Sequence, residues 1–142
     1  MLTDSQIILR LILGAALGGL VGLEREKHNK NTAGLRTHIL VCVGSTLIML
    51  TSIYVFEAYG HLAPVDPSRI AASVITGIGF LGAGTIIRSG TSVTGLTTAA
   101  SLWTISGIGL AVGCGFYVAS FAAGIIALAA LYLLRKLPIE DK

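Results

Sequence analysis

The sequence has little charge. Only 12% of its 142 residues are Asp, Glu, Lys or Arg, and 54% are hydrophobic, whereas about 25% of the residues in a soluble globular domain are charged. No Asp or Glu lies inside any of its long apolar runs. The scarcity of charge excludes a soluble globular domain as the main unit. The lack of carboxylates in the runs argues against a cation carrier or a proton relay, because these proteins usually place one there.

Cysteine is also scarce. Cys42 and Cys114 are the two in the sequence, and they fall near opposite ends of the predicted spans. A disulfide needs Cα atoms within about 7 Å, so we expect these thiols not to pair. Two lone cysteines do not form a metal-ligand pattern. His28 and His38 are ten residues apart and belong to no cysteine-containing metal motif, so no metal site and no cofactor are predicted.

Apolar residues fall into five runs, and each is close to the roughly 17 to 25 residues that a membrane-spanning helix needs. The runs cover residues 5–23, 39–56, 70–87, 96–113 and 116–134. The first run is too long for the apolar core of a signal peptide and has no small-residue cleavage pattern. The sequence therefore predicts an all-α fold, a polytopic membrane bundle of five transmembrane helices. Residues 1–142 form a single transmembrane domain, with no soluble C-terminal domain expected.

The basic residues predict the orientation of these spans, since Lys and Arg gather on the cytoplasmic side. An N-terminus outside and a C-terminus in the cytoplasm would put most of them inside: Arg25, Lys27, Lys30, Arg36, Arg88, Arg135, Lys136 and Lys142. Topology thus accounts for the positive charge. No nucleic-acid recognition motif accompanies it, so the lipid bilayer is the expected partner and nucleic acid is not.

Glycine is abundant in two of the predicted helices. Small residues let helix backbones approach closely in lipid. The first helix has glycines four residues apart and the third has four within eight positions: Gly14, Gly18 and Gly22, then Gly77, Gly79, Gly82 and Gly84. We expect both sets to pack tightly inside the bundle, with enough small-residue surface left for a homodimer or a larger complex. The GxGxxG match in the third helix is not a dinucleotide site, because no strand precedes it and no acidic residue follows at the required distance.

Arg10 and Asp66 are charged residues at the predicted outer side. Arg10 shares a helix face with Gly14. It either snorkels to the headgroups or pairs with a carboxylate, for which Asp66 is the first candidate. Asp66 followed by Pro67 predicts a helix start, in which Asp66 caps the orphan amides. Arg69 lies three residues from Asp66 and within its reach.

Polar residues near the predicted inner side offer two further interpretations. The loop 24–38 either obeys the positive-inside rule and touches anionic lipid, or binds an acidic partner or a phosphate. Thr97, Ser101 and Thr104 lie on one face of the fourth helix. This hydroxyl stripe either lines a solute path or joins neighbouring helices.

A weak internal repeat appears at an offset of 61 residues, where the pairs Gly18 and Gly79, Gly34 and Gly95, and Ser45 and Ser106 coincide. It predicts a parallel repeat of helices one and two by helices three and four, an arrangement that many transporters use. Helices one and three would then lie near the centre, with the fifth helix as an addition.

Three segments together resemble a known family. Residues 22–45 (GLEREKHNKNTAGLRTHILVCVGS), 77–86 (GIGFLGAGTI) and 93–103 (VTGLTTAASLW) are similar to signature stretches of the MgtC/SapB family of bacterial inner-membrane proteins. The resemblance covers nearly the whole chain, in the family's order. It implies a multi-pass protein of the bacterial inner (cytoplasmic) membrane that is associated with magnesium homeostasis, adaptation to low magnesium and virulence through survival inside macrophages.

The resemblance also implies a function and a set of functional residues. The best-known members are regulators that act on membrane partners, including ATP synthase, and many continue into a cytosolic C-terminal domain, which is not expected within residues 1–142. The family's pattern falls on Arg10, Glu24, Arg25, Gly34, Arg36, Thr37, His38, Asp66, Arg69, Gly77, Gly79, Gly82, Gly84 and Thr98.

Two functions stay open on this basis. One is a regulatory membrane protein that acts through helix contacts. The alternative is a small ion or solute transporter or channel built on the helix-pair repeat. An enzyme is not expected, because no nucleophile has a base at a recognisable spacing.

Overall fold

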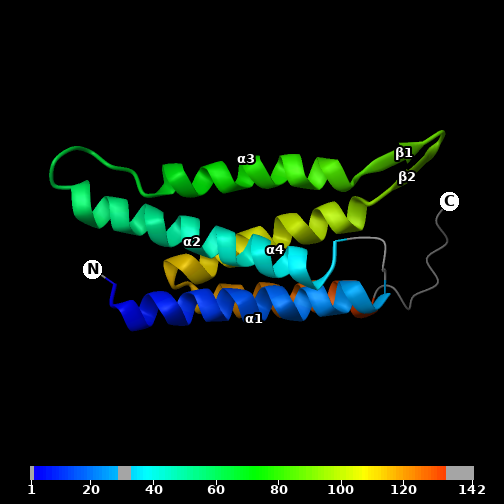
Figure 1. Ribbon diagram of the computed structural model, residues 1–142, viewed down its shortest axis with the longest axis horizontal. Helices are drawn as coiled ribbons and strands as arrows, with labels where there is room; N and C mark the ends of the chain where they lie inside the picture. The colour runs from blue at the N-terminus through cyan, green and yellow to red at the C-terminus, as the bar shows by residue number, and fades with distance from the viewer. Residues whose placement is uncertain (1, 29–32, 134–142) are drawn as a thin grey trace.

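The described residues form a bundle of five helices with one short β-hairpin (Figure 1). A computed structural model of the chain describes residues 2–28 and 33–133. In chain order the elements are α1 (Asp4–His28), α2 (Leu35–Tyr59), α3 (Ser68–Thr85), β1 (Ile87–Ser89), β2 (Ser92–Thr94), α4 (Leu96–Cys114) and α5 (Tyr117–Leu133). The helical bundle predicted from the apolar runs is confirmed. Leu134, the end of the predicted fifth run, and the basic residues Lys30, Arg135, Lys136 and Lys142 lie outside the described residues.

Within residues 2–28 and 33–133, three helices are long and apolar enough to cross a membrane. They are Asp4–Lys27, Leu35–Tyr59 and Leu96–Cys114. Tyr117–Leu133 is apolar but shorter, and α3 has Arg69 in its first turn. Five spans and their orientation therefore stay a prediction.

The charged ends of α1 and α2 are helical, although residues 24–38 were expected to form a loop. α1 continues through the charged residues to His28 and α2 begins at Leu35. The backbone amide of Leu35 donates to the Glu26 carboxylate at 2.8 Å. This bond satisfies one of the orphan amides at the start of α2. The two helices extend past the apolar core because their polar turns can be solvated and capped.

α4 lies at the centre of the bundle, packed against all four other helices (Figure 1). α1 and α2 form a close antiparallel pair on one side of it, α5 packs on α4 and α1, and α3 packs on α4 and α2. The main core joins three of these helices: Leu17, Val21, Cys42, Ile105, Ile108 and Val112. The expectation that helices one and three are central is wrong, because the apolar and small residues of α4 are buried on several sides, whereas α3 buries one narrow stripe.

The short connector between α3 and α4 is a β-hairpin. β1 and β2 pair antiparallel, with Arg88 opposite Val93. Gly90 adopts φ +61° in the turn and Gly95 adopts φ +88° where α4 begins. These left-handed conformations suit glycine.

Glycines of α1 lie directly against α2. A Cβ atom placed on Gly18 would stand 2.7 Å from the carbonyl oxygen of His38 and 2.8 Å from the Cβ atom of Cys42. One on Gly22 would stand 2.7 Å from the Cα atom of Leu35, and one on Gly14 would stand 2.6 Å from a side-chain oxygen of α2. The two backbones therefore approach as closely as they do only because these side chains are missing.

The glycines of α3 do not pack as expected. Nothing lies within 4 Å of a Cβ atom placed on Gly77, Gly79 or Gly84, and Gly82 meets Ala99 only at an ordinary 3.6 Å. α3 instead buries a stripe of Ala71, Val74, Ile78 and Gly82. The tight packing inferred for this helix is therefore not found within the chain.

Two glycines of α4 make the close approach that was expected of α3. A Cβ atom on Gly113 would stand 2.6 Å from the Cβ atom of Met49, and one on Gly109 would overlap the carbonyl oxygen of Cys42. The Thr46 hydroxyl lies beside them and donates to the Gly109 carbonyl oxygen at 3.0 Å. The α2–α4 contact is thus held by close backbone approach and by a polar bond.

Candidate functional site

A buried polar cluster joins α1, α2 and α4 at the end of the bundle where α1 ends and α2 and α4 begin (Figure 1). It consists of Arg25, His38, Thr98 and Ser101, and is called the Arg25–His38 cluster below. His38 and Thr98 are almost fully buried, with 0% and 1% of their surfaces exposed. Burying a polar group costs free energy unless the group is hydrogen-bonded, so the hydrogen bonds within the cluster determine whether its burial is stable.

His38 bridges α2 and α4. Its Nδ1 lies 2.8 Å from the Gly34 carbonyl oxygen and its Nε2 lies 3.0 Å from the Ser101 hydroxyl. The Ser101 hydroxyl also lies 2.8 Å from the Thr98 carbonyl oxygen. The Gly34 carbonyl oxygen can only accept, so Nδ1 carries the proton of the neutral ring and Nε2 is an acceptor. The Ser101 hydroxyl has one proton, which it donates either to Nε2 or to the Thr98 carbonyl oxygen. The ring is therefore fixed by both of its nitrogens.

Arg25 brings a positive charge to the same cluster from α1. One of its terminal nitrogens donates to the Thr98 hydroxyl at 2.9 Å. Its Nε is buried and has no hydrogen-bond partner among the described atoms. An arginine has five donors in a planar fork, and this one is partly used. The cluster therefore contains a cation with unused donor capacity.

The other inner-side candidates lie apart from this cluster. Arg36 and Thr37 are exposed on the first turn of α2, and Glu24 is half-buried near the end of α1. The structure thus brings together Arg25, His38 and Thr98 from the predicted set and leaves Arg36 and Thr37 at the surface.

Arg10 fastens α1 to the turn between α4 and α5. It donates to the Gly113 carbonyl oxygen at 2.7 Å and to the Tyr117 hydroxyl at 3.1 Å. The guanidinium carbon lies 5.9 Å from the centre of the Tyr117 ring. A cation at the last carbonyls of a helix also complements the helix dipole. The pair expected between Arg10 and Asp66 is not formed, because the carbonyl end of α4 lies closer to Arg10.

Asp66 caps the start of α3. Its carboxylate accepts from the Ser68 amide at 2.8 Å and from the Ser68 hydroxyl at 2.7 Å. These two bonds, with a smaller contribution from the charge of Arg69, hold the pKa of Asp66 below its ordinary value. The helix begins at Ser68, with Pro67 just before it. Asp66 and Arg69 are both exposed, so the structure supports a structural role for Asp66.

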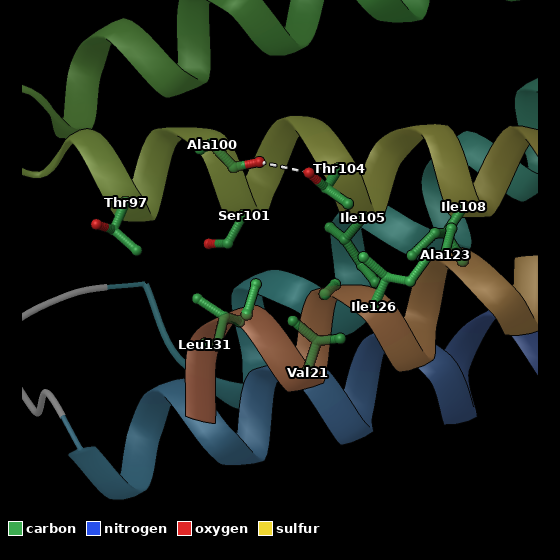
Figure 2. A pocket seen from close by; sticks show the side chains of 12 residues that line it. Val21, Thr97, Ala100, Ser101, Thr104, Ile105, Ile108, Ala123, Ile126 and Leu131 are labelled. Atoms are coloured by element: carbon green, nitrogen blue, oxygen red, sulfur yellow. Dashed lines mark hydrogen bonds between the residues drawn. The ribbon is translucent and has the colours of Figure 1, made fainter. Parts of the chain in front are cut away.

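A cavity of about 450 Å³ lies between α4, α5 and α1 (Figure 2). Its walls are apolar apart from the expected hydroxyl stripe of Thr97, Ser101 and Thr104. The Thr104 hydroxyl donates to the Ala100 carbonyl oxygen at 2.9 Å, as Figure 2 shows, and Ser101 bonds within the Arg25–His38 cluster. Two of the three hydroxyls are therefore occupied by protein partners.

Other chemistry-bearing groups are dispersed in the described part of the chain. Among residues 2–28 and 33–133, no three His, Cys, Asp or Glu side chains gather in a way that could hold a metal ion. Cys42 and Cys114 are free thiols, one buried and one exposed.

Sequence reasoning missed Tyr117, Gly109 and Gly113. The spacing of four between the two glycines, the same as in α1, was a local signal for them. The contact of Tyr117 with Arg10 joins residues more than a hundred positions apart, so no local pattern indicated it.

Comparison with known proteins decides the family. A model of the MgtC family matches residues 11–138. The chain belongs to the MgtC family. MgtC of Salmonella typhimurium is 45% identical to this MgtC-family chain over 129 residues, 91% of the chain and 52% of that protein. SapB of Bacillus subtilis is 43% identical over 124 residues, 84% of the chain and 53% of that protein.

A third relative carries a functional name. The Escherichia coli protein named "Putative magnesium transporter YhiD" is 43% identical over 135 residues, 94% of this chain and 62% of that protein. The chain thus spans about half to three-fifths of the length of these curated relatives. No solved structure matches. The predicted membership of the MgtC/SapB family is confirmed, and this MgtC-family chain is a membrane protein with apolar helices long enough to span a bilayer.

Proposed function

We propose that the chain is a regulatory, non-enzymatic membrane protein that acts through helix contacts with membrane partners in adaptation to low magnesium and intracellular survival. The observation that carries this proposal is the free face of α3. Gly77, Gly79 and Gly84 have open space where a Cβ atom would lie, and Phe80 is 82% exposed. In lipid, where helices gain nothing from burying apolar surface, small residues that permit close backbone approach favour association.

The same face provides the surface for a second copy of the chain, and we propose a homodimer through it. By family resemblance, another membrane protein such as ATP synthase is a further partner. The protein would lie in the bacterial inner membrane with its N-terminus outside. The position of Arg25, Arg36 and Arg88 at one end of the bundle supports this orientation, because basic residues gather on the cytoplasmic side.

Complementation tests the proposal. In a bacterium that lacks its own MgtC-family protein, Gly79→Leu should abolish growth support in low magnesium while leaving the amount of folded protein unchanged. Val118→Leu is the matched control, since Val118 is 81% exposed on α5 and already carries a side chain. Normal growth with Gly79→Leu would contradict the role of the α3 face.

A transporter is the second candidate function. It is supported by the name of the Escherichia coli relative and by the repeat, since α2 and α4 begin at Leu35 and Leu96, 61 residues apart, each preceded by a glycine. Purified protein in liposomes should be assayed for flux of magnesium, phosphate and protons. Reproducible saturable flux of any of these would refute a purely regulatory role.

A further inference from the structure

The helix pairs α1–α2 and α3–α4 are arranged in space as a repeat. α1 packs on α2 and α4, and α3 packs on α4 and α2, so exchanging α1 with α3 and α2 with α4 leaves these contacts unchanged. α5 breaks the symmetry, because it packs on α4 and α1. The equivalent position lies on α2 and α3, where residues within 40–48 and 73–81 line an open groove of about 370 Å³. This α2–α3 groove is the counterpart of the seat that α5 fills.

Repeat-equivalent residues line the seat of α5 and the α2–α3 groove. A Cβ atom on Gly124 of α5 would stand 3.6 Å from the Cδ2 atom of Leu17, and Leu13 packs on the same core. At the offset of 61 residues, Leu17 corresponds to Ile78 and Leu13 to Val74. Both counterparts line the α2–α3 groove. The groove therefore suits a helix that presents a small residue to Ile78, as α5 presents Gly124 to Leu17.

α3 itself carries the pattern that α5 uses in its seat. Residues 120–128 (SFAAGIIAL) and 73–81 (SVITGIGFL) share Ser-x3-Gly-x3-Leu. In α5, Ser120 and Gly124 are buried and Leu128 packs on the core. In α3, the same three positions line the α2–α3 groove, and nothing lies within 4 Å of a Cβ atom placed on Gly77. α3 thus has the face that such a seat accepts, and this face has no helix against it among the described residues.

We propose that the α2–α3 groove holds α3 of a second copy of the chain, in a two-fold symmetric dimer. The inference rests on the homodimer of the proposed function and places it on the Gly77 side of α3. α5 runs in the same direction as α1 (Figure 1), so its counterpart runs parallel to α3. A two-fold axis along the membrane normal meets this requirement, because it relates two parallel copies of α3. The contact is isologous, since each α3 lines one groove and fills the other.

Charges at the start of α3 fit the same arrangement. Arg69 lies one turn before Ser73 on the same face, and Asp66 lies three residues before Arg69. Arg69 and Asp66 are both exposed, and both bonds from Ser68 go to Oδ1 of Asp66. In the parallel pair, Oδ2 of Asp66 accepts from Arg69 of the partner subunit, and the symmetry repeats this bond. The face is therefore complementary to itself in shape and in charge.

The oligomeric state of the full chain in detergent tests the proposal. Light scattering after size-exclusion chromatography should give a dimer for the wild type and a monomer for Gly77→Leu, whose side chain fills the groove. Gly107→Leu is the matched control, because Gly107 has the same open space but lies outside the groove, and it should stay dimeric. Asp66→Asn keeps an N-cap residue and should weaken the dimer at least about twofold, since two exposed ion pairs are lost. Helical content shows that each variant is folded.

Disulfide cross-linking in the membrane locates the contact. The background is Cys114→Ser, since Cys114 is exposed whereas Cys42 is buried. Ser73→Cys should give a cross-linked dimer on oxidation, because the two-fold axis brings the two copies of residue 73 together. Ala72→Cys changes the adjacent exposed residue, which lies on a different face of α3, and should give none.

Three outcomes would overturn the inference. A dimeric Gly77→Leu variant would show that the second copy does not lie in the groove. Cross-linking through Ala72→Cys in place of Ser73→Cys would put the second copy on the opposite side of α3. A wild type that is monomeric in detergent and gives no cross-link through Ser73→Cys would exclude the dimer.

The groove and the proposed function can fail separately. A monomeric Gly77→Leu variant that still supports growth in low magnesium would confirm that the groove holds the second copy and would refute a regulatory role for the dimer.

Discussion

Replacing Gly18 by alanine adds one methyl group where α1 meets α2. The new Cβ atom would stand 2.7 Å from the His38 carbonyl oxygen, whereas ordinary contact begins near 3.4 Å. A backbone oxygen cannot rotate away as a side chain can. The two helices must therefore separate locally by about 0.7 Å.

That separation sets the size of the effect. A gap of 0.5 to 1 Å forfeits about a quarter to a half of each affected dispersion contact, and overpacking of well-packed sites costs about 1 to 3 kcal/mol. We expect Gly18→Ala to lower the free energy of unfolding by about 2 to 3 kcal/mol. The matched control is Gly79→Ala at the repeat-equivalent position, where nothing lies within 4 Å, and its effect should be below about 0.5 kcal/mol.

Reversible unfolding by SDS in mixed micelles, followed by circular dichroism, measures both values at a protein concentration low enough to favour the monomer. Equal stability of Gly18→Ala and the wild type would refute the argument from close backbone approach. A loss of stability in Gly79→Ala as large as that in Gly18→Ala would show that the Gly79 side of α3 packs against another part of the chain.

Three further predictions concern the tie at Arg10 and the start of α3. Arg10→Met should lower the free energy of unfolding by about 1.5 to 3 kcal/mol, the value of hydrogen bonds to a charged group. Tyr117→Phe should lower it by about 0.5 to 1.5 kcal/mol. Equal effects of the two substitutions would contradict the role of the Gly113 carbonyl. Gly115→Ala should cost at least about 1 to 2 kcal/mol, because Gly115 adopts φ +86° and its Cβ atom would meet Arg10 at 3.0 Å; thermal melts in detergent measure the loss. The pKa of Asp66 is lowered in the folded protein, so its ionised carboxylate stabilises the fold fully at pH values above about 4, the ordinary pKa of aspartate. This stabilisation should be lost as the pH falls through the lowered native pKa. A loss of protection of the Ser68 amide against hydrogen exchange when the pH is lowered from 7 to 5 would contradict this.

Local sequence features account for much of the bundle. Runs of apolar residues indicated the five helices, since an apolar segment of this length must satisfy its backbone internally. The Asp66–Pro67 pair indicated the start of α3, because capping depends on neighbours in the chain. The glycine spacing in α1 lies on the face that meets α2, because spacing defines a face of a helix.

The partners of these features depended on the whole structure. Gly18 and Gly79 occupy equivalent positions in the weak repeat, yet a Cβ atom on Gly18 would touch a facing backbone and one on Gly79 would face open space. The ladder of glycines in α3 could not reveal that Gly82 lies against Ala99 of α4, whereas Gly77, Gly79 and Gly84 have nothing within 4 Å among the described residues. Likewise, Arg10 was expected either to reach the headgroups or to pair with a carboxylate, but it donates to the Gly113 carbonyl oxygen at the end of α4.

The sequence by itself thus determined that the chain is a membrane helix bundle, which residues form its helices, and that it belongs with the MgtC and SapB proteins. These features could be predicted because hydropathy, capping and motif identity are properties of neighbouring residues. Only the tertiary structure decided that α4 is central, that Arg25, His38 and Thr98 meet in one buried cluster, and that a largely apolar cavity lies between α1, α4 and α5. Each of these depends on which helix faces meet, and contacts between α1, α2 and α4 join residues more than 60 positions apart.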